Sequence, residues 1–216
     1  TVTFVDEDGS VLQAAQAYDY GTLAGSIALP KAPEKPSSAE ITYTFAGWIP
    51  EISDVTADVI YKATYSSTTN SYTIVFVNEG ETLQSSDIAY GVIPVYAGVT
   101  PTKPSSVQYM YNFKGWSPEI SAVTSDAVYT AVFDSTLVRY YVQFLNGENV
   151  LQADTLEYGI LPSYNAAIPT KENSQAYSYS FKGWSPAISA VTSDAVYKAE
   201  FDSVAIPVLS SSSSAE

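Results

Sequence analysis

Three tryptophans recur at a constant spacing and are the side chains in this chain best suited to bind a ligand. Trp48, Trp116 and Trp184 each follow a glycine, and 68 residues separate each from the next. An indole ring exposed on a sheet stacks well on a sugar or on another aromatic group. Alternation along residues 109–114 places Trp116 outward, but a bulge at Gly115 would return the ring to the core. The bulge is the preferred interpretation because a small domain needs large apolar anchors, and ligand stacking is the alternative.

Recurring carboxylates raise two further kinds of chemistry. An aspartate follows Val-Thr-x three times, at Asp58, Asp126 and Asp194. With Glu51 and Glu119 these could form acid–base pairs, but Ala187 stands at the third equivalent position, so caps of local turns are expected instead. Residues 6–9 (Asp-Glu-Asp-Gly) resemble the start of a calcium loop. They lack its alternating ligands and closing glutamate, and a hairpin turn is expected there.

Lysine and glutamine also recur in register. The lysines are Lys35, Lys103 and Lys171, and the glutamines are Gln13, Gln84 and Gln152. An internal lysine–asparagine crosslink would need an asparagine in register, and none recurs, so no crosslink is expected. The glutamines are expected to face outward on a strand. The chain has no histidine and no cysteine, which excludes disulfides, thiol chemistry and histidine-based catalytic triads. We therefore expect no enzymatic activity, no cofactor and no bound metal.

Charge limits the partners. The 216 residues carry a net charge of -14, which repels nucleic acid phosphates and anionic lipid heads and favours a monomer. No apolar run approaches the roughly 18 residues that a membrane span requires. We expect neither nucleic acid binding nor membrane insertion.

A period of about 68 residues divides the chain into three units. Between residues 113–133 and 181–201, 18 of 21 positions are identical. Short polar boundaries at residues 66–71 and 134–138 give units at 1–67, 68–136 and 137–204. Residues 205–216 form a serine-rich linker, after which another module or an anchor is expected.

Each unit is predicted to be a small β domain. Asn146-Gly147 separates two apolar alternating runs and indicates a tight hairpin, while proline-rich segments such as 101–106 oppose a long helix. The three differences between the near-identical segments are Glu119/Ala187, Thr130/Lys198 and Val132/Glu200. The last two share one face of the closing strand, and that face is predicted to be wet while Tyr129 and Phe133 face the core.

Together these motifs resemble a known family. The order Tyr-x-Phe-x-Gly-Trp, then Val-Thr-x-Asp-x-x-Tyr-x-Ala-x-Phe/Tyr, after an upstream Tyr-Gly, is similar to the Listeria–Bacteroides repeat, also called the InlB B-repeat. The resemblance implies a β-grasp-like fold, tandem arrays on bacterial surface proteins and no catalytic residues. The chain departs from the pattern in the prolines after the tryptophan, Pro50 and Pro118.

Two functions follow as expectations. The first is a non-enzymatic, extracellular spacer or stalk of a bacterial surface or secreted protein, built as a monomeric, elongated array and presenting another, adhesive module. The alternative is a multivalent module that binds a glycan or a host or bacterial surface protein through the repeated Gly-Trp sites.

Overall fold

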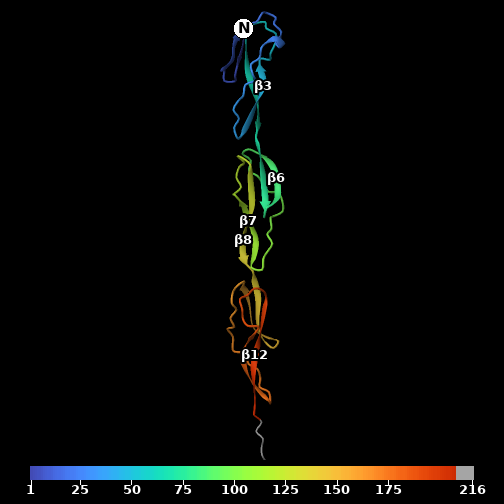
Figure 1. Cartoon of the computed structure of the whole chain (residues 1–216), viewed down its shortest axis with the longest axis vertical. Coiled ribbons are helices and arrows are strands. Elements are labelled where there is room, and N and C mark those ends of the chain that lie inside the picture. The colour runs from blue at the N-terminus through green and yellow to red at the C-terminus, as the bar shows by residue number, and fades with distance from the viewer. Residues whose placement is uncertain (208–216) are drawn as a thin grey trace, which may run out of the picture. The chain divides into compact units, whose positions relative to one another are not determined.

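The computed structural model describes residues 1–207 and consists almost entirely of β-strands, with one short 3₁₀ turn at Ala24–Ser26. The strands form three four-stranded sheets, one after another in chain order (Figure 1). This confirms the prediction of a mainly β chain made of three tandem units. Within the described part of the chain, no helix is long and apolar enough to cross a membrane.

The three sheets have the same construction. The first contains β1 (Val2–Val5), β2 (Val11–Gln16), β3 (Ile41–Ile49) and β4 (Val59–Thr69). The second contains β5 (Ser71–Asn78), β6 (Glu81–Ala89), β7 (Tyr109–Ser117) and β8 (Ala127–Leu137). The third contains β9 (Arg139–Asn146), β10 (Asn149–Glu157), β11 (Tyr177–Ser185) and β12 (Ala195–Ala205). Their strand orders are β2-β1-β4-β3, β6-β5-β8-β7 and β10-β9-β12-β11.

In each sheet the first and last strands of the unit are parallel neighbours at the centre. In the first sheet Phe4 lies opposite Tyr61, and in the third Phe144 lies opposite Tyr197. An antiparallel hairpin partner flanks the first strand, as predicted for the Asn146-Gly147 turn, where Asn146 pairs with Asn149. This central parallel pair with antiparallel flanks is the strand arrangement of a β-grasp sheet.

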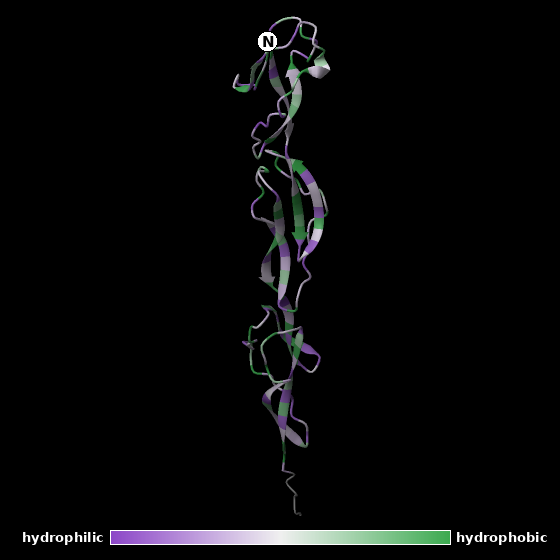
Figure 2. Cartoon of the chain, turned by 45° about the horizontal axis from the view of Figure 1, so that its top comes forward, coloured by the Kyte–Doolittle hydropathy of each residue, from purple (hydrophilic) through white to green (hydrophobic). Residues whose placement is uncertain are grey.

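Alternation along the strands gives each sheet one core face. In β4, Tyr61 and Ala63 are buried while Lys62 is exposed, and β12 repeats the pattern with Tyr197 buried and Lys198 exposed. The solvent exposure of two other positions predicted on the wet face differs: Val132 is half-buried, whereas the equivalent Glu200 is exposed. Figure 2 shows hydrophilic and hydrophobic residues interleaved along the strands.

The Tyr-Gly motif and the valine of the Val-Thr-x-Asp motif bond to each other and hold the loops over the core. The amide of Gly91, from the Tyr-Gly motif, donates to the carbonyl of Val123 at 2.8 Å, and the amide of Val123 donates to Val92 at 3.0 Å. Gly21 with Val55 and Gly159 with Val191 make the same contact. Val55, Val123 and Val191 are all buried. The loop that follows Tyr-Gly thereby covers the aromatic face of its own sheet.

A serine turn caps the start of each edge strand. The amide of Tyr109 donates to Ser106 Oγ at 2.9 Å, and the amide of Tyr177 donates to Ser174 Oγ at 2.9 Å. Ser38 does the same for Ile41 at 3.1 Å. These side chains occupy edge amides that would otherwise offer a pairing site to another strand.

The segments expected as boundaries are strand rather than loop. Residues 66–69 belong to β4 and residues 134–137 to β8, so that one residue, Asn70 or Val138, connects successive sheets. The polar residues led us to expect linkers at these segments. They are strand instead, because serine and threonine are also compatible with a strand that faces water on both sides. Of the expected serine-rich linker at 205–216, residues 208–216 lie outside the described residues.

Candidate functional site

The glycine before each tryptophan forms a bulge. Pairing shifts by one residue between Phe45 and Gly47 in β3 and between Phe181 and Gly183 in β11. The φ angles of Gly47, Gly115 and Gly183 are 139°, 155° and 156°, a region that favours glycine. The bulge interpretation of the Gly-Trp motif is therefore confirmed.

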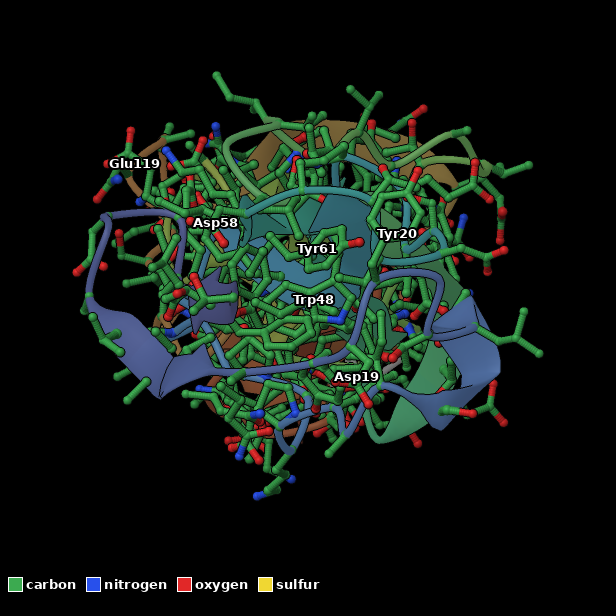
Figure 3. The ribbon with its side chains drawn as sticks, turned by 90° about the horizontal axis from the view of Figure 1, so that it is seen from above. Asp19, Tyr20, Trp48, Asp58, Tyr61 and Glu119 are labelled. Atoms are coloured by element: carbon green, nitrogen blue, oxygen red, sulfur yellow. The ribbon has the colours of Figure 1, made fainter. Side chains whose placement is uncertain are left out.

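The bulge turns each indole toward the core. The ring centroids of Trp48 and Phe4 lie 4.8 Å apart in an edge-to-face arrangement. Trp116 with Phe76 and Trp184 with Phe144 repeat this geometry, also at 4.8 Å. Trp48, labelled with Tyr61 in Figure 3, packs against the core cluster that contains Tyr61. Each indole thus packs against a buried phenylalanine of its own core, and stacking on a ligand remains a prediction without supporting geometry.

The recurring aspartates accept hydrogen bonds from backbone groups at the start of their own unit and do not cap a local turn. Asp126 Oδ1 accepts a hydrogen bond from the amide of Thr73 at 2.8 Å, and Asp194 Oδ1 accepts one from Tyr141 at 2.7 Å. Asp58 accepts one from the ammonium of Thr1, which lowers the pKa of its carboxyl. The expectation of a local cap was wrong because the partner lies 53 residues earlier, on the neighbouring parallel strand. Glu51 and Glu119, the possible acid–base partners, are both exposed.

Residues 6–9 form a hairpin turn, as expected. The amide of Gly9 donates to the carbonyl of Asp6 at 2.9 Å, and Ser10 donates to Asp8 Oδ1 at 2.9 Å, which lowers the pKa of Asp8. Among the described residues, no group of three or more histidine, cysteine, aspartate or glutamate side chains could hold a metal ion. The carboxylate of Asp6 instead accepts a hydrogen bond from the Tyr65 hydroxyl at 2.7 Å. Burial and this contact raise the pKa of Tyr65 to about 12.

The recurring lysines lie over tyrosine rings. The ammonium groups of Lys35, Lys103 and Lys171 are 4.3, 4.9 and 4.1 Å from the ring centroids of Tyr43, Tyr111 and Tyr179. Lys35 also pairs with Glu7 at 2.6 Å, which raises its pKa. In each unit the lysine and its tyrosine are eight residues apart. This constant spacing is visible in the sequence, but strand alternation alone does not predict that the two side chains are in contact. These cation–π contacts fasten the proline-rich loop to the edge strand.

The recurring glutamines do not simply face water. Gln84 donates through Nε2 to the carbonyl of Val95 at 3.0 Å and accepts from the amide of Ala97 at 2.9 Å. Gln152 makes the same pair of bonds to Ser163 and Asn165, at 2.9 and 2.8 Å. A side-chain amide is suited to this role because it can pair with both a carbonyl and an amide of one loop. The glutamines therefore hold the covering loop to the hairpin.

With these contacts in place, comparison with known protein families gives a match for the first unit. Residues 1–71 match the Listeria-Bacteroides repeat domain. The second and third units share the strand order of the first, its Gly-Trp motif at a spacing of 68 residues, and a Tyr-Gly motif before it. The resemblance inferred from the motifs is thereby confirmed for the matched residues.

A solved structure and the curated proteins complete the comparison. The chain is similar to the Streptococcal High Identity Repeats in Tandem (SHIRT) domains 3-4 from a cell surface protein, with 14% sequence identity and a TM-score of 0.30. That match covers 62% of this chain and 99% of the other. No curated protein matches the chain.

Two tyrosines at the unit boundaries were not predicted to have a role. The Tyr72 hydroxyl donates to the carbonyl of Ala39 at 2.7 Å, and the Tyr140 hydroxyl donates to Val107 at 2.6 Å. Each bond joins the opening strand of one unit to the loop that precedes the edge strand of the unit before it. The signal available in the sequence was the 68-residue spacing of the two tyrosines, each two residues after a connector.

Proposed function

We propose that this chain is a non-enzymatic spacer of a bacterial surface or secreted protein, which holds a neighbouring module away from its attachment point. The family of the first repeat supports the assignment to a surface protein. The absence of histidine and cysteine from the sequence supports a role without catalysis.

The observation that carries the proposal is the bonding of the one-residue connectors. The amide of Asn70 donates to Glu40 of the first unit at 2.8 Å, and its carbonyl accepts from Tyr90 of the second unit at 2.8 Å. Val138 repeats both bonds, with Gln108 and with Tyr158, each at 2.9 Å. A residue held on both sides cannot serve as a flexible hinge, because bending there breaks backbone hydrogen bonds that each contribute about 0.5–1.5 kcal/mol.

Side chains add to the first connector. Asn70 Nδ2 donates to the carbonyls of Ser38 and Ala39, each at 3.0 Å, and Asn70 Oδ1 accepts from the Thr42 hydroxyl at 2.7 Å. With the Tyr72 hydroxyl, these contacts leave no free chain between the two sheets. A spacer needs this property, because a flexible linker would let the presented module fold back.

Spin-label distance measurements test the proposal. Nitroxide labels on the exposed Ser53 and Ser121, each changed to cysteine, report on the first two units, and the chain has no cysteine of its own. We expect a narrow distance distribution. Insertion of a Gly-Ser hexapeptide after Asn70 should broaden it, whereas the same insertion in the exposed hairpin turn after Gly80 should not. A distribution that is already as broad without the insertion would contradict the spacer proposal.

A binding screen addresses the alternative. Glycan and surface-protein probes are compared on the full chain and on a chain that lacks residues 71–138, one whole period. Binding that rises steeply with the number of units would support multivalent recognition instead.

A further inference from the structure

We propose that each unit is built to carry tension along the chain, and that the parallel ladder between its first and last strands is the element that resists it. The inference deepens the spacer proposal, since a spacer that connects two attached bodies is loaded at its ends. The ladder is nevertheless a property of each unit by itself and is tested separately.

The direction of loading follows from the strand order of a unit. The chain enters the second unit at Ser71, the start of β5, and leaves it at Leu137, the end of β8. Residues 74–77 of β5 pair in parallel with residues 127–130 of β8. Entry and exit therefore lie at opposite ends of the paired segment. Tension along the chain draws β5 and β8 past each other lengthwise, so that the evenly spaced ladder bonds are loaded together and not one after another.

The first and third units repeat this arrangement. Residues 2–5 pair in parallel with 59–62, and residues 142–145 pair with 195–198. In both, the chain enters through the first strand and leaves through the last strand of the parallel pair. Each unit would then resist a pull applied at the two points where the chain enters and leaves it.

A stacked pair of aromatic rings bridges each ladder on the core side. Phe76 and Tyr129, which lie opposite each other, have ring centroids 5.3 Å apart and planes inclined by 26°. The pairs Phe4–Tyr61 and Phe144–Tyr197 match this geometry, each at 5.2 Å. Phe76 is fully buried and Tyr129 is 3% exposed. These rings keep water from one face of the ladder, and water is the competitor that replaces a hydrogen bond when strands separate.

The recurring aspartates lengthen the ladder by one bond. Asp126 immediately precedes β8, and its carboxylate holds the amide of Thr73, which immediately precedes the first ladder residue of β5. Asp194 and Tyr141 occupy the same positions in the third unit. This bond joins the same two strands and is therefore loaded with the ladder, which gives the Val-Thr-x-Asp motif a role that a local turn cap would not have.

The connectors pass tension on without slack. Because Asn70 alone separates β4 from β5, and Val138 alone separates β8 from β9, the closing strand of one unit pulls directly on the opening strand of the next. No loop has to straighten before the ladders are loaded.

Single-molecule pulling in two directions tests the inference on the full chain. Handles are attached through cysteines that replace exposed serines, and the chain has no cysteine of its own. The Ser71/Ser135 pair loads the ladder of the second unit lengthwise. The Ser71/Ser125 pair grips both strands at the same end and peels them apart one bond at a time. All three serines are exposed, and the two variants share the Ser71 handle, so they differ mainly in the direction of the force.

At equal force we expect the second unit to unfold far more slowly through the Ser71/Ser135 pair. About four ladder bonds, each worth roughly a fivefold factor in rate, break together in this direction, which predicts a difference of about 10²–10³-fold. Equal unfolding rates in the two directions would overturn the inference. A broad spin-label distance distribution together with a large difference between the two pulling directions would contradict the spacer proposal and support the ladder inference. A narrow distribution together with equal unfolding rates would support the spacer proposal and overturn the ladder inference.

A matched pair of core variants separates mechanical from general stability. Phe76→Leu removes a ring that bridges the ladder, whereas Val123→Ala removes buried groups of the same core cluster from a residue outside any strand. We expect both to lower resistance to urea, and Phe76→Leu to accelerate lengthwise unfolding several-fold more than Val123→Ala. An equal acceleration by the two variants would show that the ladder has no special part in resisting force.

Discussion

Replacing the bulge glycine of the first unit by alanine tests how the tryptophan is brought to the core. Gly47 has a φ angle of 139°, and an added Cβ would have no atom within 4 Å. Gly47→Ala therefore creates no clash, and its cost is the backbone strain of a side chain in a region that L residues avoid, about 1–3 kcal/mol. The same substitution also stabilises by about 0.4–1 kcal/mol, because alanine restricts the unfolded chain.

The first unit offers a control that isolates the strain. Gly25 likewise has no atom within 4 Å of an added Cβ, and its φ lies outside the range that disfavours side chains. Gly25→Ala changes the unfolded chain in the same way without straining the folded one. The difference in unfolding free energy between the two variants should therefore equal the strain alone, about 1–3 kcal/mol.

Native-state hydrogen exchange of the β3 and β4 amides measures this difference within the intact chain, because exchange reports the opening free energy of each region separately. We expect faster exchange in Gly47→Ala than in Gly25→Ala by a factor that corresponds to that energy. Indistinguishable exchange would refute the argument that a glycine-only bulge places Trp48.

Three further predictions concern the remaining contacts. Emission of the three tryptophans should be blue-shifted and poorly quenched by acrylamide, because each indole packs against a core phenylalanine. Red-shifted, readily quenched emission would restore the ligand-stacking hypothesis. The folded-state pKa of Tyr65, about 12, exceeds the ordinary value of 10.0, so the stability that it contributes is complete below pH 10 and is lost as the pH rises toward 12. Thermal melting should accordingly show the gap between the wild type and Tyr65→Phe shrinking over that interval, and a constant gap would contradict this reasoning. Gln84→Ala should accelerate amide exchange at Ala97 by roughly fivefold, the equivalent of one typical hydrogen bond, while the exposed neighbour Thr82→Ala leaves it unchanged.

The sequence was sufficient for features that depend on neighbours along the chain. The Asn146-Gly147 hairpin follows from local turn chemistry, and the buried and exposed positions of β4, Tyr61 and Lys62, follow from alternation. The bulge at the Gly-Trp motif could also be predicted, because strict alternation would have left a large apolar ring in water in every unit.

Contacts between distant segments could not be derived in this way. Asp126 binds an amide 53 residues earlier, and that pairing depends on the first and last strands being parallel neighbours, which periodicity does not encode. From the sequence Gln84 is predicted to be an outward-facing strand residue, because its hydrogen-bond partners belong to a loop whose path the sequence does not predict. The one-residue connector Asn70 was hidden by the polar residues around it, which are typical of linkers and of exposed strands alike.

The one-residue connectors also restrict how the gene can change. A recombination event between two copies that adds or removes a whole period rebuilds every connector with its bonding partners on both sides, because those partners recur at the same spacing. An insertion of any other length at a connector separates Asn70 or Val138 from these bonding partners. The near identity of residues 113–133 and 181–201 supplies the matching DNA that unequal crossing-over requires. Lineages that carry this array are thus expected to differ by complete copies, or by short length changes within loops and turns, and not by insertions at the connectors.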